Sequence, residues 1–149
     1  MGYSGPKWTM LLGEHEHALD EKNRLTLPSK LRGAFTDGVV VSRGLDGCLL
    51  AWPVEAWRAM VARVETVDPF SADGRKIRRH YFSGASPGEL DKQGRLVIPA
   101  TLLAAVGITR EVTVAGVSDH LEIWDRATWR QQLHEVEGSA EDVAERLAN

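Results

Sequence analysis

Two short stretches of the sequence combine a carboxylate and a guanidinium at the same spacing. Asp20 precedes Arg24 in LDEKNRLTLP, and Asp91 precedes Arg95 in LDKQGRLVIP, 71 positions further on. An aspartate can accept hydrogen bonds from the amides of a tight loop and can also hold an arginine. An arginine held in this way is a planar, bidentate donor with a fixed direction. The pattern therefore predicts two oriented arginines, one in each copy.

The residue before each arginine and the nearby lysines refine this prediction. Asn23 and Gly94 occupy the same slot, and these two residue types tolerate a positive φ best, so we expect a left-handed turn there. The alternative is that each Asp–Arg pair only pins a turn, since repetition also fits a shared structural need. A pure turn would not need the additional cations Lys22 and Lys92, which favour binding.

The elements around these loops follow the same order twice. Short strands flank each loop, and a short helix, a hairpin and a longer helix follow. In the first half, strands are expected at 11–20, 24–28, 38–44 and 48–53 and helices at 28–35 and 54–67, with a further helix starting at 68–69. In the second half, a strand, a loop and a short strand are expected within 88–99, further strands at 110–117 and 120–124, and helices at 100–108 and 125–137.

Tryptophans mark the same place in both halves. Trp52 and Trp57 are five residues apart, as are Trp124 and Trp129. We interpret the chain as a tandem duplication with two copies. One half is too small to bury a stable core, so the two halves are expected to close on each other around a pseudo-two-fold axis. The tryptophans are assigned to that core or to helices packed on it, with base stacking as the alternative.

Composition limits the class of protein. The 149 residues carry a net charge of −3, but the segment from residue 135 onward holds five acids and one arginine, which leaves +1 for the rest. The basic run GRKIRRH (74–80) therefore remains a candidate for solvent exposure, DNA contact or an oligomer interface. A single cysteine, Cys48, no apolar run of membrane-spanning length and no signal peptide predict a cytoplasmic protein.

Motifs for catalysis or metal binding are weak. GASPG (84–88) matches a nucleophile elbow around Ser86, but Pro87 has no N–H to complete an oxyanion hole. His15 and His17 could form a metal pair, but no further ligands cluster near them in sequence. We therefore expect no enzyme activity, no metal site and no cofactor.

Several separated segments resemble the MraZ family of bacterial transcriptional regulators with tandem SpoVT-AbrB-like domains. They are MLLGEHEHALDEKNRLTLPSKLR, IRRHYFSGA, LDKQGRLVIP and GVSDHLEIWDRATW, in order from about residue 10 to about residue 132. The resemblance implies a mainly β fold with α (α+β), a pseudo-two-fold swapped-hairpin β-barrel with flanking helices. The expected division is an N-terminal extension (1–9), a first repeat (10–57), a helical connector (58–86), a second repeat (87–133) and an acidic tail (134–149).

The resemblance also implies a function. It points to sequence-specific binding of short direct repeats in the promoter of the division and cell-wall gene cluster, including the protein's own gene, by a ring-shaped homo-oligomer at the nucleoid. Its partners would be double-stranded promoter DNA and further copies of itself, with no membrane and no small-molecule substrate. The alternative is a ring-forming scaffold without DNA binding, whose acidic tail recruits partners.

The Asp-x-x-x-Arg element is the DNA-contacting loop in the resembled family. The resemblance implies that Arg24 and Arg95 read guanine edges and that Asp20 and Asp91 orient the loops. The sequence departs from the family pattern at Asn23, where the family usually has glycine. Cations beside the loops would neutralise phosphates, although the two on the short helix could simply be solvated. The DNA-binding residues expected are Lys22, Asn23, Arg24, Lys30, Arg32, Lys92, Gly94 and Arg95.

Overall fold

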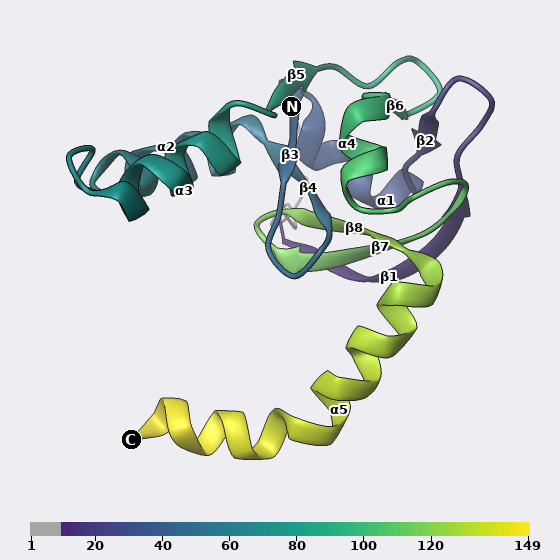
Figure 1. The fold of residues 1–149 in the computed structure, drawn as a ribbon. Coiled ribbons are helices and arrows are strands. Elements are labelled where there is room, and N and C mark those ends of the chain that lie inside the picture. Colours follow the sequence, from purple (N-terminus) through teal and green to yellow (C-terminus); the bar gives the residue numbers. More distant parts are fainter. Residues whose placement is uncertain (1–9) are drawn as a thin grey trace, which may run out of the picture.

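The structure is a computed structural model that describes residues 10–149, so the expected extension at 1–9 lies outside the described part. It is an α+β protein with an antiparallel six-stranded sheet and a two-stranded ribbon (Figure 1). The elements are β1 (Leu11–Ala18), β2 (Arg24–Thr26), α1 (Ser29–Arg32), a 3-10 turn (Gly33–Phe35), β3 (Val39–Arg43), β4 (Leu49–Pro53), α2 (Val54–Glu65), α3 (Ala72–Phe82), β5 (Ser86–Gly88), β6 (Arg95–Val97), α4 (Ala100–Ala105), β7 (Glu111–Ser118), β8 (Leu121–Asp125) and α5 (Arg126–Ala148).

The two halves of the chain are interlocked by exchanged strands. The sheet order is β1-β7-β8-β4-β3-β5, so β1 of the first half pairs with β7 of the second. In the same way β5 of the second half pairs with β3 of the first. The short strands β2 and β6 pair with each other, with Leu25 opposite Leu96. Neither half could keep this arrangement alone, because each supplies a strand to the hairpin of the other.

The exchanged hairpins were predicted, but the predicted closed barrel is not seen. In the described residues β1 and β5 remain the two edges of the six-stranded sheet, and β2–β6 forms a separate ribbon. The cause is local: the loops at residues 20–24 and 91–95 reverse the chain, so the strands that follow leave the sheet and pair with each other. Strand β5 is also only three residues long and carries Pro87, which an edge strand tolerates.

Both faces of the central hairpin β3–β4 are buried, so two hydrophobic clusters form. Val39 and Val41 face a large cluster that also contains Leu25 and Leu96 of the ribbon, while Val40 faces a smaller one. The large cluster lies between the sheet, the ribbon and helices α1 and α4. This cluster therefore anchors the ribbon that both arginine loops adjoin.

The smaller cluster confirms the assignment of the tryptophans to the core. Trp52 and Trp124 are 6% and 2% exposed, and Trp57 and Trp129 pack against them from α2 and α5. The Trp124–Trp129 ring centroids are 5.8 Å apart. These positions exclude base stacking for the two buried rings, because their faces are covered by protein.

Helix α3 begins later than the sequence predicted. The Asp68–Pro69 start was wrong, because the side chain of Asp68 accepts the N–H of Phe70 and forms a turn instead. The helix starts at Ala72, where the Ser71 hydroxyl accepts the N–H of Gly74. Helices α2 and α3 form a hairpin that projects from one side of the sheet (Figure 1).

The acidic tail is part of one long helix. Helix α5 starts where the Asp125 side chain accepts the N–H of Thr128, and it runs through Ala148. It bends near its middle (Figure 1). Within the helix the Ser139 hydroxyl donates to the Glu135 carbonyl, a contact of the kind that often bends helices. None of the helices in residues 10–149 is long and apolar enough to cross a membrane.

Candidate nucleic-acid interface

The first arginine loop, residues 20–24, is built around one carboxylate. Oδ1 of Asp20 accepts the backbone N–H groups of Lys22 and Arg24, both at 2.9 Å. Oδ2 of Asp20 accepts Nε of Arg24 at 2.6 Å. One aspartate therefore closes the turn and holds the Arg24 guanidinium at its Nε.

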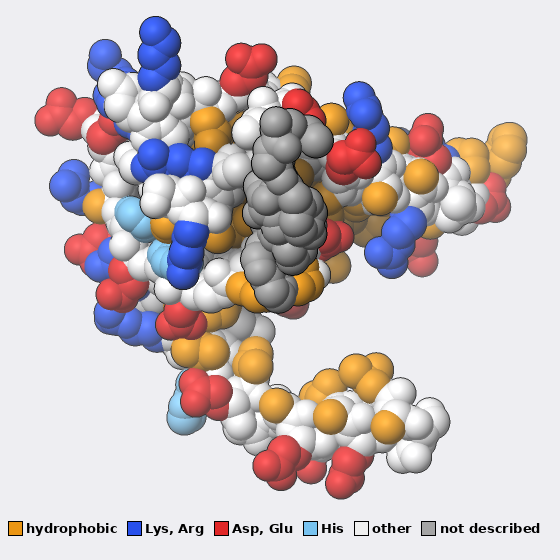
Figure 2. All heavy atoms as spheres, turned by 180° about the vertical axis from the view of Figure 1, so that it is seen from behind, with side chains coloured by type: hydrophobic (Ala, Val, Ile, Leu, Met, Phe, Trp, Pro, Cys, Tyr) orange, Lys and Arg blue, Asp and Glu red, His pale blue; other side chains and the backbone are white. Residues whose placement is uncertain are grey.

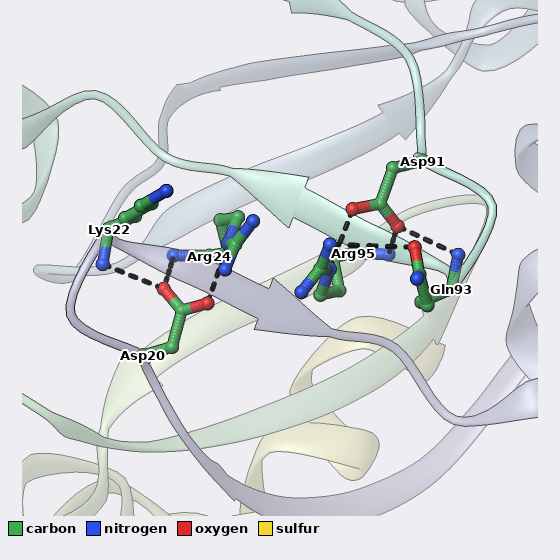
Figure 3. Close-up of polar contacts among 6 residues, drawn as sticks. All are labelled: Asp20, Lys22, Arg24, Asp91, Gln93 and Arg95. Carbon is green, nitrogen blue, oxygen red and sulfur yellow. Dashed lines mark hydrogen bonds and ion pairs between the residues drawn. The ribbon is translucent and has the colours of Figure 1, made fainter.

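The second loop, residues 91–95, repeats this geometry. Asp91 accepts the backbone N–H groups of Gln93 and Arg95 at 2.9 Å each, and Nε of Arg95 at 2.6 Å. Figure 3 shows the two aspartates on the outside and the two arginines between them, on adjacent strands. The two roles considered for the aspartate, accepting the loop amides and holding the arginine, occur together in both copies.

The slot before each arginine is left-handed, as predicted. Asn23 has φ +58° and Gly94 has φ +74°. This conformation turns each carbonyl toward the other half: Ile98 N–H donates to Asn23, and Leu27 N–H donates to Gly94, at 3.0 and 2.9 Å. These two hydrogen bonds join each loop to the end of the short strand of the other repeat, so the two loops are held next to each other.

The hydrogen bonds to the aspartates lower their pKa values. The pKa of Asp20 falls from 3.8 to about 2, mainly because the Arg24 backbone N–H donates to the carboxylate, with further help from the Arg24 side chain and the Lys22 N–H. The pKa of Asp91 is lowered for the same first reason, the N–H of Arg95. Both carboxylates therefore stay ionised at any physiological pH, and both arginines stay held.

The arginines present their remaining donors on one outer face of the ribbon. Leu25 and Leu96 point into the core, so Arg24 and Arg95 stand on the opposite, outer side of β2 and β6 as diagonal neighbours. Their side chains are 26% and 28% exposed. Among the described residues, Nη1 and Nη2 of Arg24 have no acceptor, and Arg95 has only the Gln93 amide oxygen at 3.4 Å. Each arginine can therefore hold its turn through Nε and still offer its remaining N–H groups to a ligand.

Arg32 lies behind the second loop and not on open solvent. Its Nε donates to the Leu27 carbonyl at 2.8 Å, and the side chain is half-buried. A Cβ on Gly94 would lie only 2.1 Å from that Nε, so the arginine occupies the space that a side chain at position 94 would need. A side chain at position 94 would therefore have to displace Arg32, and Arg32 is half-buried against the second loop and not simply solvated.

The lysines expected at the site are on its rim. Lys22, Lys92 and Lys30 are all exposed. Figure 2 shows Lys and Arg side chains gathered, among acidic ones, at the end of the molecule that holds the ribbon. Long cations placed in this way suit contacts with phosphates around a central pair of arginines.

Two residues near the loops were missed by the sequence reasoning. Arg110 lines a surface hollow with Asp20, Lys22 and Arg24, because the Leu19 N–H donates to its carbonyl at 2.8 Å. Val97 is 60% exposed on the outer face of the ribbon, opposite Arg24. Period-two alternation from Leu96 could have found Val97, whereas only the pairing of the halves brings Arg110 to the loop.

The basic run at 74–80 divides into two kinds of residue. Arg75 donates to the carbonyls of Pro69 and Phe70, and Arg78 donates to those of Glu65 and Val67 at the end of α2. These two arginines hold the α2–α3 turn. The other two cations of the run are exposed and have no side-chain partner within residues 10–149; they are Lys76 and Arg79.

The remaining chemical candidates take structural positions. Ser86 is the first residue of β5 and pairs with Val41, so it does not stand on a strand-to-helix turn. Cys48 is 1% exposed, and burial raises the pKa of its thiol to about 12. Within residues 10–149 no group of three or more His, Cys, Asp or Glu side chains could hold a metal ion.

The fold and site together define a class: a small α+β protein of two interlocked repeats that share one exposed, arginine-bearing ribbon. The family model described as MraZ protein, antitoxin-like, matches residues 10–80 and again residues 81–149. The chain therefore belongs to the MraZ family, a family of regulatory proteins, and the resemblance seen in the sequence is confirmed. Each of the two matched ranges contains one arginine loop.

Proposed function

We propose that this protein is a sequence-specific DNA-binding transcriptional regulator that acts on the promoter of the division and cell-wall gene cluster, including its own gene. The observation that carries the proposal is the pair Arg24 and Arg95. Each is held at Nε by an aspartate at 2.6 Å, and both turn their outer nitrogens to one face of a shared ribbon.

A two-stranded ribbon is one of the elements that the major groove of B-DNA admits. The major groove is about 12 Å wide and admits two paired strands. Arginine is the usual bidentate partner of guanine O6 and N7, and each such contact contributes about 1–3 kcal/mol of discrimination. Lys22, Lys92 and Lys30 on the rim would contact phosphates and set the register of the protein on the duplex.

One ribbon offers few contacts, so a single copy is expected to bind weakly. An oligomer that engages consecutive short direct repeats gains affinity through effective concentration without new types of contact. We therefore propose that the working form is a ring-shaped homo-oligomer bound to promoter DNA, located in the cytoplasm at the nucleoid.

A gel shift with the DNA directly upstream of the protein's own gene tests the proposal. Binding should weaken steeply as salt rises, because phosphate contacts release counterions. The double variant Arg24→Ala/Arg95→Ala should lose specific binding while its thermal unfolding stays cooperative. Arg58→Ala is the matched control, because Arg58 is an exposed arginine on α2, outside both loops.

Two results would count against the proposal. Unchanged binding by the double variant would remove the loops from the DNA interface. Assembly of the wild-type chain without affinity for the upstream DNA would favour the alternative, a scaffold that organises protein partners.

A further inference from the structure

An apolar groove runs between α2 and α3, on the side of the molecule away from the ribbon. It has a volume of about 620 Å³ and is lined mainly by Met60, Val64, Val67, Ile77 and Tyr81. The groove opens to solvent within the described residues, and these side chains are half-buried, except for Val64, which is buried. A hollow with an apolar lining can receive apolar side chains of a partner.

Helix α5 carries an apolar seam whose outer part is left uncovered by the rest of residues 10–149. The seam continues from Trp129 with alternating steps of four and three residues, the spacing of a helix-packing stripe, through Leu133, Val136, Ala140, Val143 and Leu147. Only its start rests on the sheet. From residue 134 onward every residue is exposed except the half-buried Val143, and Leu147 is 83% exposed.

The hairpin that holds the groove and the outer half of α5 carry opposite net charges. The α2–α3 hairpin, residues 54–82, holds six Lys or Arg against four Asp or Glu, and Arg63 lies on the groove itself. Residues 135–149 of α5 hold five acids against Arg146. The exposed cations Lys76 and Arg79, which take no part in holding the α2–α3 turn, are available to the acidic helix. Two α5 helices placed side by side would repel each other instead.

The sizes of the two surfaces also match. The stretch from Val136 to Leu147 spans eleven steps, about 16 Å at 1.5 Å per residue, and the eleven residues of α3 have the same length. In Figures 1 and 2 the outer half of α5 and the hairpin extend to the same side with open space between them. The hydrophobic side chains of α5 face that space, and the acidic ones face away from it (Figure 2).

We propose that the groove between α2 and α3 receives the apolar seam of the outer half of α5 from a second copy of the chain. The chain's own α5 is held at its start by the Trp124–Trp129 contact and the ion pair of Arg126 with Glu111, so it stays apart from its own groove. The contact is head-to-tail: each copy offers one groove and one helix. Such contacts produce closed rings or open filaments.

This inference rests on the self-association in the proposed function and supplies its interface. Two pairs of matched variants of the full chain test it by sedimentation over a range of concentrations. Leu147→Asp alters the seam, and Ala148→Asp adds the same charge on a neighbouring face. Ala62→Glu places a bulky acid in the groove, and Ala59→Glu makes the same change on α2 outside the groove lining.

The wild-type chain should self-associate, and Leu147→Asp and Ala62→Glu should each weaken the association by about tenfold or more. Ala59→Glu and Ala148→Asp should behave as the wild type. The four altered residues are all exposed, and three of them are alanines. The variants should therefore fold, and thermal unfolding followed by circular dichroism checks this.

Mixing the two disruptive variants gives the sharpest result. The intact groove of Leu147→Asp can receive the intact helix of Ala62→Glu, so an equimolar mixture should form heterodimers although each variant alone does not. An effect of Leu147→Asp without any effect of Ala62→Glu would overturn the proposal in favour of α5–α5 pairing. A wild-type chain that stays monomeric at every concentration would overturn it as well.

DNA binding separates this inference from the proposed function. Leu147→Asp should still bind a single repeat but lose the affinity gained on tandem repeats. Arg24→Ala/Arg95→Ala should lose DNA while remaining assembled. If the arginine variant loses DNA and the groove variants assemble normally, the interface is wrong and the DNA-binding function stands.

Discussion

The two arginine loops share one hydrogen-bonding pattern but rest on different supports. In both, an aspartate accepts two backbone N–H groups at 2.9 Å and the arginine Nε at 2.6 Å. Behind the second loop lies Arg32, in the space beside Gly94. The corresponding residue of the second half, 71 positions on, is Leu103, which is buried in the large cluster. Asn23 can therefore carry a side chain where Gly94 cannot.

The cations of the two loops also sit in different slots. In the first loop the lysine follows Glu21, whereas in the second Lys92 stands at the position of Glu21, and Gln93 stands at that of Lys22. The second loop is thus more positive in its own residues, while the first gains Arg110 from β7's start. The local sequence thus sets the shape of each loop and its own charge, and the packing of the two halves adds a distant arginine beside each loop, Arg110 at the first and Arg32 at the second.

The largest expected effect is on DNA affinity. Arg24→Ala and Arg95→Ala, tested singly, should each cost about 1–3 kcal/mol of binding free energy, because each removes one bidentate contact. Fluorescence anisotropy on the proposed direct repeats measures the loss. If the shared geometry governs function, the two losses should agree within a factor of about three. A large loss from only one arginine would show that the loops act unequally on DNA.

The next effect is on stability. Gly94→Asn places a Cβ against Arg32, displaces its hydrogen bond to Leu27, and should lower the free energy of unfolding by about 1–3 kcal/mol. The mirror change Asn23→Gly should alter it by less than about 1 kcal/mol. Urea denaturation measures both values.

A double variant checks the cause of that difference. In an Arg32→Ala background the space beside residue 94 is empty, so Gly94→Asn should cost less than it does in the wild type. Equal costs in the two backgrounds would mean that the backbone conformation alone, and not Arg32, demands glycine.

A smaller effect is expected at the first loop. Arg110→Ala should lower the slope of log affinity against log salt concentration by about 0.9, the value of one phosphate contact, without changing which sequence is bound. Arg146→Ala at the far end of α5 is the matched control. An unchanged slope would remove Arg110 from the interface.

The smallest effect concerns acid titration. With its pKa lowered from 3.8 to about 2 by the Arg24 N–H, Asp20 stabilises the folded state fully above pH 4, and this stabilisation declines as the pH falls toward 2. The pKa of Asp91 is lowered in the same direction. Carboxyl NMR titration should find both midpoints below 3.8. A midpoint at the ordinary value in either loop would contradict the close Asp–Arg geometry there.

Much of the site could be predicted because its rules are local. An aspartate four residues before an arginine and a residue that tolerates positive φ are readable from spacing and residue type. The helix ends were less predictable: Asp68 and Ser71 are both good capping residues, and only the structure shows that Asp68 makes a turn and Ser71 caps α3. The open sheet was also missed, because sequence alternation does not say whether two edges meet.

By itself, the sequence determined the duplication, the paired Asp–Arg loops with their left-handed slots, and the MraZ family. These depend on residue type and short spacing, which fix local hydrogen bonds and backbone conformation. Only the tertiary structure decided that β2 meets β6, so that Arg24 and Arg95 share one face. It alone placed Arg32 against Gly94 and Arg110 beside Asp20. Such contacts join residues distant in the chain, and they exist only because each half lends a strand to the other.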